Sequence, residues 1–393
     1  MTMMVGLLAA MAIVLRASSG SAQTTETAAQ QAFKEDVHAT AGLTCAACHQ
    51  GAPATYAALP RTAIAPLCGK CHSDPAYIKG FDPQVRVDQY TQYLTSAHGK
   101  RMSGGETRVA TCSDCHGAHG IRRVRDARSS VAPLNVVQTC AKCHDDPVRM
   151  AAFGSRATPV KDWSASVHAA ALLKRGDTSA PTCSTCHGSH GATPPGVTQV
   201  ANVCAQCHVR EAELFRASPK KAIFDQIDQP ECLACHGNHR VEHPTDAWVG
   251  FKEPAVCAMC HDERMKGAST ITATQKGLAD MTAKIGAAEV VLTRAERAGM
   301  LVDDGRAALR DAREHEIHSR VLVHAFATKP FADMADPGVR AAQESQTVGE
   351  RALHELQVRR RGLFAATVVI VGFLVTLWFK IRRLGGAGGE PHA

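Results

Sequence analysis

The stretch Thr111–Gly120 reads TCSDCHGAHG, and it decides the fold because two cysteines stand three positions apart with a histidine directly after the second. This is the pattern to which haem c is covalently attached. Thiols at this spacing can form thioethers with the two vinyl groups of one porphyrin, and the adjoining imidazole then lies beneath the iron as an axial ligand. Cys112, Cys115 and His116 take these roles.

The same pattern occurs eight times and uses all 16 cysteines. The predicted attachment residues are Cys45, Cys48, Cys68, Cys71, Cys112, Cys115, Cys140, Cys143, Cys183, Cys186, Cys204, Cys207, Cys232, Cys235, Cys257 and Cys260. The predicted proximal iron ligands are His49, His72, His116, His144, His187, His208, His236 and His261. Zinc ribbons and disulfide scaffolds also pair cysteines, but neither requires a histidine after every second one. The sequence therefore predicts eight covalently bound haem c groups.

A longer repeat precedes alternate motifs. It consists of an aromatic residue, a polar residue three positions later and an iron-ligating residue type two positions after that. Its copies are Phe33/Asp36/His38, Tyr93/Ser96/His98, Trp163/Ser166/His168 and Phe215/Ser218/Lys220. Two haem motifs follow each copy, which predicts four dihaem repeats, here called the first to the fourth, at about 33–80, 90–150, 160–212 and 213–265.

A second histidine follows the proximal one by three residues in the last three repeats, in the shared form CHGxH. Three residues cannot wrap around a porphyrin, so this histidine is expected to ligate a neighbouring haem. The two patterns together predict six distal ligands, which are His38, His98, His119, His168, His190 and His239. The first repeat has Ala52 where the others have this histidine.

Two of the eight irons remain without a patterned distal ligand, and three residues are candidates for them. His243 lies four residues beyond the last CHGxH histidine, where an exposed loop residue is the alternative. Lys220 occupies the ligand position of the fourth repeat, although a lysine beside a second lysine in a Pro-containing loop is ordinarily solvated. His324 lies on the apolar face of a predicted helix, where a packed core histidine is the alternative. No residue is assigned a catalytic role.

Residues 1–22 are a predicted secretory signal peptide. An apolar run, Val5–Leu15, is followed by small residues that end near Ala22. The run is too short to cross a bilayer as a finished helix, and an uncleaved anchor is the alternative. Because haem c is attached outside the cytoplasm, signal and motifs together predict a periplasmic haem domain.

The uncharged run Gly362–Phe379 predicts one transmembrane helix, at 361–383, followed by a cytoplasmic tail, 384–393. Three basic residues flank the run on each side, so the positive-inside rule does not orient it. The haems orient the helix instead, because they place the residues before it in the periplasm. The lipid bilayer is therefore one predicted partner.

Residues 268–360 are predicted to form a helical stalk. Apolar and small residues recur at steps of three and four, at Leu278, Met281, Ile285, Ala288, Leu292, Ala295 and Gly299. A first helix is expected to end near Gly299 and a second to span 303–326, opening on two aspartates that suit a helix N-terminus. The Lys329-Pro330 and Asp336-Pro337-Gly338 stretches are expected to break the helical structure. A third helix is then expected to start near Val339 and to continue into the membrane.

Composition excludes a nucleic-acid role. The formal charge is +7, which alone would suggest an acidic partner, but two propionates on each haem reverse the sign. Aromatic residues make up only 5% of the chain, few for a core around eight motifs. Haem is expected to supply the missing apolar area, so the fold of this part should depend on its cofactors.

With these motifs, repeats and anchor, residues 33–265 resemble the membrane-anchored periplasmic octahaem members of the multihaem c-type cytochromes. The resemblance implies a mostly α fold with extensive loops. A haem-stack domain at 23–267 is then followed by the helical hairpin stalk and one C-terminal transmembrane helix in the inner membrane.

The resemblance implies electron transfer. The expected donor is a membrane quinol-oxidising subunit or a cytochrome b-type protein, and the expected acceptor is a periplasmic cytochrome or reductase. Quinol dehydrogenases of this broad group carry an N-terminal anchor, so the C-terminal anchor argues against direct quinol oxidation. The alternative is a reductase of nitrite, hydroxylamine or tetrathionate that acts at a haem with an open distal site, although such enzymes often replace the proximal histidine and no motif here does. A structural wire is a third reading, against which the anchor argues.

Overall fold

The computed structural model describes residues 27–51, 56–194 and 202–385. The chain divides into two compact bodies. The N-terminal body comprises Met1–Cys140 with His190–Ala192, and the C-terminal body comprises Ala141–Ser189 with Thr193–Ala393. The predicted signal peptide, Ala52 and all but the first two residues of the predicted tail lie outside the described residues.

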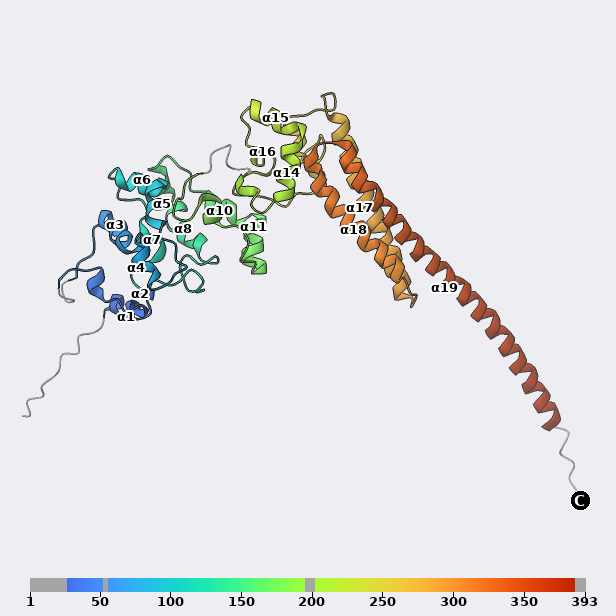
Figure 1. Cartoon of the computed structure of the whole chain (residues 1–393). Helices are drawn as coiled ribbons and strands as arrows, with labels where there is room; N and C mark the ends of the chain where they lie inside the picture. The colour runs from blue at the N-terminus through green and yellow to red at the C-terminus, as the bar shows by residue number, and fades with distance from the viewer. Residues whose placement is uncertain (1–26, 52–55, 195–201, 386–393) are drawn as a thin grey trace, which may run out of the picture. The chain divides into compact units, whose positions relative to one another are not determined.

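Short helices and loops form the described part of the chain before residue 268, and no strand occurs in it. Figure 1 shows these helices as brief coils between long connections. They are α1 (Ala28–Lys34), α2 (Val37–Thr40), η1 (Cys45–Ala47), α3 (Arg61–His72), α4 (Pro75–Lys79), α5 (Gln89–Thr95), α6 (Ala97–Ser103), α7 (Cys112–His116), α8 (Val136–His144), α9 (Pro147–Ala151), α10 (Pro159–Ser164), α11 (Val167–Ala169), η3 (Ala170–Lys174), α12 (Cys183–His187), α14 (Val209–Ala217), α15 (Pro219–Gln226), α16 (Leu233–His236), η4 (Asp246–Trp248) and η5 (Val256–Met259). The mostly α fold class with extensive loops is confirmed.

Local capping explains why a new helix starts shortly after the second motif of the first two repeats. In α4 the Asp74 carboxylate accepts hydrogen bonds from the backbone N–H groups of Ala76 and Tyr77, at 2.9 and 3.1 Å. Asp146 does the same at the start of α9. Each aspartate is followed by a proline in the first helical position, where a missing N–H costs no hydrogen bond.

The hydrophobic core cluster of the described residues lies in the stalk, apart from Val249 at its edge. Its buried members all fall between Leu278 and Ala352. Before residue 268 the buried apolar side chains are scattered and many are alanine or valine. Protein side chains alone therefore give the haem-binding part little apolar area to bury, as the low aromatic content predicts.

Three long helices form the stalk and its extension. They are α17 (Ala268–Arg297), α18 (Asp303–Leu322) and α19 (Thr328–Gly385), and a short 3₁₀ turn, η6 (Val323–Ala325), links the last two. The predicted seam of α17 is buried from Leu278 to Ala295. Gly299 follows the helix with a φ of +80°, the left-handed conformation that glycine adopts at helix ends. The expected end of the first helix and start of the second are confirmed, whereas α18 ends four residues before the expected 326 and η6 follows it.

The third stalk helix starts earlier than predicted. The sequence places its start near Val339, but α19 runs without a break from Thr328 through both proline-containing stretches. Pro330 lies in the first turn, where backbone N–H groups have no helical acceptor to lose. Pro337 removes one helical hydrogen bond, but apolar packing on both sides holds the helix together, since Ala335 before it is 3% exposed and Ala342 after it is fully buried.

Small residues let α19 approach the other two helices closely. Its buried face contains Ala335, Ala342 and Ser345 at heptad spacing, and Gly338 and Gly349 continue the same seam. A Cβ at Gly338 would come within 2.6 Å of the His315 Cβ on α18. This seam escaped the sequence prediction because glycine, alanine and serine do not stand out as apolar.

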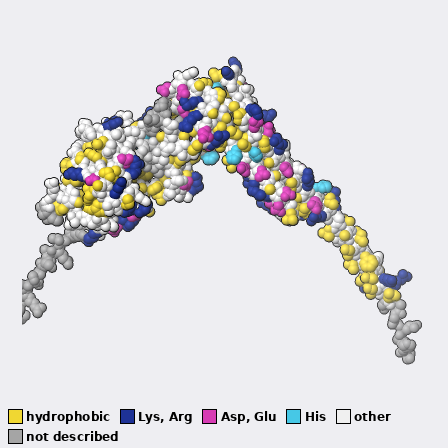
Figure 2. Space-filling model, in the orientation of Figure 1, with side chains coloured by type: hydrophobic (Ala, Val, Ile, Leu, Met, Phe, Trp, Pro, Cys, Tyr) yellow, Lys and Arg dark blue, Asp and Glu magenta, His cyan; other side chains and the backbone are white. Residues whose placement is uncertain are grey.

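The described part of the chain contains one helix that is long and apolar enough to cross a membrane. It is α19, whose most apolar window has a mean hydropathy of 2.3 and is not buried by the rest of the protein. Figure 1 shows α17 and α18 lying along the first part of α19, which then continues alone. Figure 2 shows hydrophobic side chains covering this last part, with basic side chains at its end. A C-terminal apolar helix that fits a single membrane pass is therefore present.

Replacing Leu292 with alanine should destabilise the stalk by about 2–5 kcal/mol, because the side chain is fully buried between α17 and its neighbours. The measurement is thermal unfolding of the detergent-solubilised full-length protein, followed by far-UV circular dichroism. Leu301→Ala is the matched control, since Leu301 is 88% exposed and should change stability by less than about 0.5 kcal/mol. Equal effects of the two substitutions would contradict the packing described here.

Candidate haem sites

A single helical turn presents the attachment residues of several motifs. In α7, Cys112 and Cys115 stand at the i and i+3 positions of one helix face, and His116 ends the helix. Gly117 follows with a φ of +86°, and the glycine after His187 or His236 has the same left-handed backbone. The glycine of CHGxH therefore turns the chain sharply away from its own haem. This turn directs the second histidine towards the proximal histidine of a different motif.

The repeat of aromatic, polar and ligand-type residues is a junction between two helices. The polar residue is buried and caps the second helix, and the ligand-type residue is the second residue of that helix. The caps are Asp36, Ser96, Ser166 and Ser218, which accept backbone hydrogen bonds from His38, Gly99, Ala169 and Lys220 at 2.8, 2.9, 3.1 and 3.2 Å. The cap therefore fixes where each ligand-type side chain starts.

The aromatic residue ties this junction to the next haem motif. The Tyr93 hydroxyl donates to the Ala110 carbonyl at 2.9 Å, and the Trp163 indole N–H donates to the Pro181 carbonyl at 3.2 Å. Both acceptors lie two residues before a motif cysteine. Burial raises the pKa of Tyr93 to about 12, so the phenol keeps the proton that it donates.

Six proximal histidines face a second histidine ring. The pairs, with the distances between ring centres, are His49–His119 (6.0 Å), His116–His190 (6.0 Å), His187–His239 (5.9 Å), His236–His324 (6.1 Å), His72–His38 (6.0 Å) and His208–His168 (6.5 Å). A metal ion bonded to two imidazole nitrogens at about 2 Å each places the ring centres about 6 Å apart. Donor type and separation therefore fit a haem iron between the rings of each pair.

The pairs fall into two geometric classes. In four of them the ring planes are nearly parallel, 7–17° apart, and the proximal histidine belongs to the first motif of its repeat. In the other two the planes are 85° and 54° apart, and the proximal histidine belongs to the second motif. The first class takes its second histidine from the segment after the repeat, whereas the second class takes it from the start of its own repeat.

Backbone hydrogen bonds join successive repeats beside the first class of pairs. The donor is the residue before a ligand histidine, and the acceptor lies two residues beyond the CHGxH histidine of the next repeat. The bonds are Val37 N–H to Ile121 C=O, Ala97 N–H to Ala192 C=O and Val167 N–H to Val241 C=O, at 2.9, 3.0 and 2.9 Å. Each repeat is therefore incomplete without the next one.

The fourth repeat has no fifth repeat after it, and the stalk takes that place. Pro219 stands at the donor position and has no N–H to offer. His324, in η6 between α18 and α19, provides the ring that faces His236. The Arg320 guanidinium bonds Asp246 at 2.9 Å and holds the pKa of that carboxyl below its usual range, which ties α18 to the fourth repeat.

Lys220 points at the proximal histidine of the second motif in its own repeat. Its Nζ lies 2.5 Å from Nε2 of His261, at the position where the first and third repeats place a histidine. His243 is exposed, and its Nδ1 contacts the Pro244 carbonyl at 2.9 Å. Of the three additional candidates, the structure therefore brings Lys220 and His324 to a proximal histidine, and among the described contacts it brings His243 to none. His98 is half-buried at the second position of α6.

Burial keeps the paired rings in the form that binds iron. It lowers the pKa of His72, His116, His190 and His236, and a neighbouring histidine lowers the pKa of the first, second and fourth further. A neutral imidazole offers the lone pair that a metal needs. The rings are therefore neutral near pH 7.

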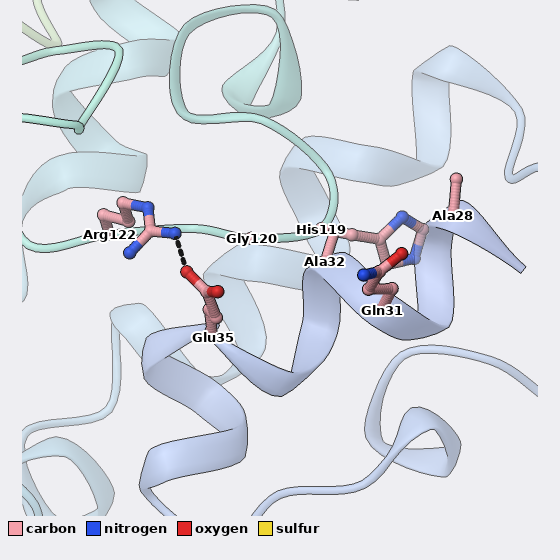
Figure 3. A pocket seen from close by; sticks show the side chains of 7 residues that line it. All are labelled: Ala28, Gln31, Ala32, Glu35, His119, Gly120 and Arg122. Atoms are coloured by element: carbon pink, nitrogen blue, oxygen red, sulfur yellow. Dashed lines mark hydrogen bonds and ion pairs between the residues drawn. The ribbon is translucent and has the colours of Figure 1, made fainter. Parts of the chain in front are cut away.

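A hollow of about 440 Å³ borders His119 in the N-terminal body. Figure 3 shows the His119 ring beside Gln31 and Ala32 of α1, and the Arg122 side chain reaching Glu35. The guanidinium lowers the pKa of the Glu35 carboxyl, so the pair is ionised near pH 7. This ion pair links α1 to the segment that carries His119.

Cysteines of successive motifs also lie close together. The Cys68 and Cys112 side chains are within hydrogen-bonding reach of one another. Cys204 and Cys232 form the same kind of contact. Each contact joins the second motif of one repeat to the first motif of the next. The second and third attachment sites therefore adjoin one another, and so do the sixth and seventh.

Two aromatic contacts could not be inferred from the repeats. Tyr56 stacks on His49 with ring centres 4.8 Å apart, and Trp248 lies 5.6 Å from His236. Neither aromatic residue recurs at matched positions in the other repeats, so the sequence pattern contained no signal for it.

Two family models match the chain. The cytochrome c3 family matches residues 37–145, and the class III cytochrome c family matches residues 155–261. Comparison with curated proteins and with solved structures finds no match.

Replacing His119 with alanine should convert one low-spin ferric haem per chain to a high-spin one, because the iron bound by His49 loses its facing ring. Electron paramagnetic resonance of the oxidised protein measures the change. His243→Ala is the matched control and should leave the spectrum as it is, since this exposed ring faces no proximal histidine among the described contacts. An unchanged His119→Ala spectrum would show that His119 is not a distal ligand.

Proposed function

This chain belongs to the multihaem c-type cytochromes, which carry electrons on covalently bound haem c, and we propose that it relays electrons between a quinol-linked membrane donor and acceptors in the periplasm. The observation that supports the relay best is the close sequence of attachment sites within each body. Cofactors attached in this way form a series through which electrons can pass.

The proposal includes eight haems, one for each motif. In each haem the motif histidine is the proximal ligand, and His38, His98, His119, His168, His190 and His239 are distal ligands. His324 is the distal ligand for the iron of His236, a role that the facing rings support. Six-coordinate irons suit electron transfer because they reorganise little on reduction and leave no position for a substrate.

The stalk sets the distance between haems and membrane. Some 34 residues of α19 separate Thr328, next to the haem-binding part, from Gly362, where the apolar run begins, and at 1.5 Å per residue they span about 50 Å. We propose that the anchor lies in the inner membrane with the haem domain in the periplasm. A quinol site within the bilayer would then be too far from the haems for direct transfer, so the donor needs a redox group that extends into the periplasm.

The partners follow from this placement. The donor is a membrane quinol-oxidising subunit or a cytochrome b-type protein with such an extension, and the acceptor is a periplasmic cytochrome or reductase. The alternative, reduction of a nitrogen or sulfur oxyanion at an open haem, needs an iron without a distal ligand. The facing residues at seven proximal histidines favour the relay.

Truncating the chain after Arg361 should abolish reduction of its haems by the membrane, because the haem domain is then released from its donor. The experiment adds a quinol to membrane vesicles of the native host and follows the haem absorption bands of the full-length protein and of the shortened one at equal concentration. The full-length haems should be reduced at least tenfold faster, and dithionite should reduce both proteins completely.

Equal rates of quinol-driven reduction would contradict a membrane-bound donor. Catalytic turnover of nitrite, hydroxylamine or tetrathionate by the purified reduced protein would replace the relay with the reductase function.

A further inference from the structure

We propose that Lys220 is the sixth ligand of the iron held by His261. The last haem of the series then has lysine–histidine coordination, whereas the other irons have bis-histidine coordination. The inference rests on the proposed function and deepens it, because it supplies a ligand for the second of the two irons to which the sequence patterns assign no distal histidine. The haem is the one attached to Cys257 and Cys260.

The local fold gives Lys220 the same starting point as a ligand histidine. Ser218 caps α15, its hydroxyl donates to the Phe215 carbonyl at 2.7 Å, and Lys220 is the second residue of the helix. His38, His98 and His168 stand at that second position after their own caps. The fourth repeat therefore keeps the framework of a ligand site and changes only the donor atom.

The direction of the side chain supports coordination. Nζ of Lys220 lies 2.5 Å from Nε2 of His261, the nitrogen that binds iron in a proximal histidine. Two metal–nitrogen bonds of about 2 Å need a separation of about 4 Å. Lysine can withdraw its amine over this difference by rotating its four-carbon stem, which a stiffer side chain could not do.

Among the described hydrogen bonds, Lys220 is the side-chain partner of Nε2 of His261. Nδ1 of His261 is buried without a hydrogen bond, and Lys220 contacts the other ring nitrogen. Lys220 forms no ion pair with a carboxylate there and lies 5.9 Å from the centre of the Phe326 ring. The adjacent Lys221 is different, because it pairs with Asp225 at 2.5 Å.

Coordination requires the neutral amine, so the lysine gives up one proton to solvent when the iron binds. An amine lacks the aromatic π system of imidazole, and it therefore holds ferric iron better than ferrous iron. The eighth haem should accordingly be spectroscopically distinct from the other seven, although all eight are low-spin when oxidised.

Three variants of the full-length protein test the assignment. The readouts are electron paramagnetic resonance and near-infrared magnetic circular dichroism of the oxidised protein, in which the charge-transfer band depends on the axial ligand pair. Wild type should show low-spin haems only, with a minor band distinct from that of the bis-histidine haems. Lys220→Ala should produce one high-spin haem per chain that added imidazole returns to low spin.

Lys220→His restores the pattern of the other repeats, so the minor band should disappear into the bis-histidine band while every haem stays low-spin. Lys221→Ala is the matched control and should reproduce the wild-type spectra. A spectrum of Lys220→Ala identical to wild type would overturn the proposal, and so would an unchanged minor band in Lys220→His, which decides the question if the alanine variant fails to fold.

The outcomes separate this inference from the proposed relay. Unchanged Lys220→Ala spectra together with quinol-driven reduction in vesicles would remove only the lysine ligand. A high-spin haem in Lys220→Ala together with no quinol-driven reduction of wild type would remove only the relay.

Discussion

Histidine rings from different segments face one another across a gap that fits one iron, and the rest of the haem-binding structure depends on this constraint. His49 and His119 belong to different repeats, as do His116 and His190. An iron between such rings would link the repeats by coordination, in addition to the thioethers that attach the porphyrin. This explains how residues before 268 can hold a defined fold although the hydrophobic core cluster of the described chain lies almost wholly in the stalk.

Each repeat needs the next one to complete its first candidate haem site, and the last repeat of such a series has no successor. The stalk takes that place at the fourth repeat. His324 faces His236, and Pro219 removes the backbone donor that would otherwise lack an acceptor. The stalk is therefore more than a spacer, since the turn that precedes α19 also provides the ring that faces His236.

This arrangement connects the membrane anchor directly to the cofactors. α19 begins at Thr328, four residues after His324, and continues to the membrane without a break. The same helix therefore fixes the distance between its apolar run and the histidine that faces His236. For the proposed relay, the consequence is that the donor must meet the haem domain well above the membrane surface.

The sequence by itself determined the covalent chemistry, because cysteine spacing and an adjoining histidine specify haem attachment locally. It also predicted the repeats, the mostly α fold and the apolar helix, since these depend on short-range patterns. It could not decide among His243, Lys220 and His324, because a sixth ligand comes from a segment distant in sequence. Only the tertiary structure placed His324 opposite His236 and Lys220 opposite His261. It also showed that α19 continues through Pro337, where packing against α17 and α18 outweighs a helix-breaking residue that local propensity treats as an interruption.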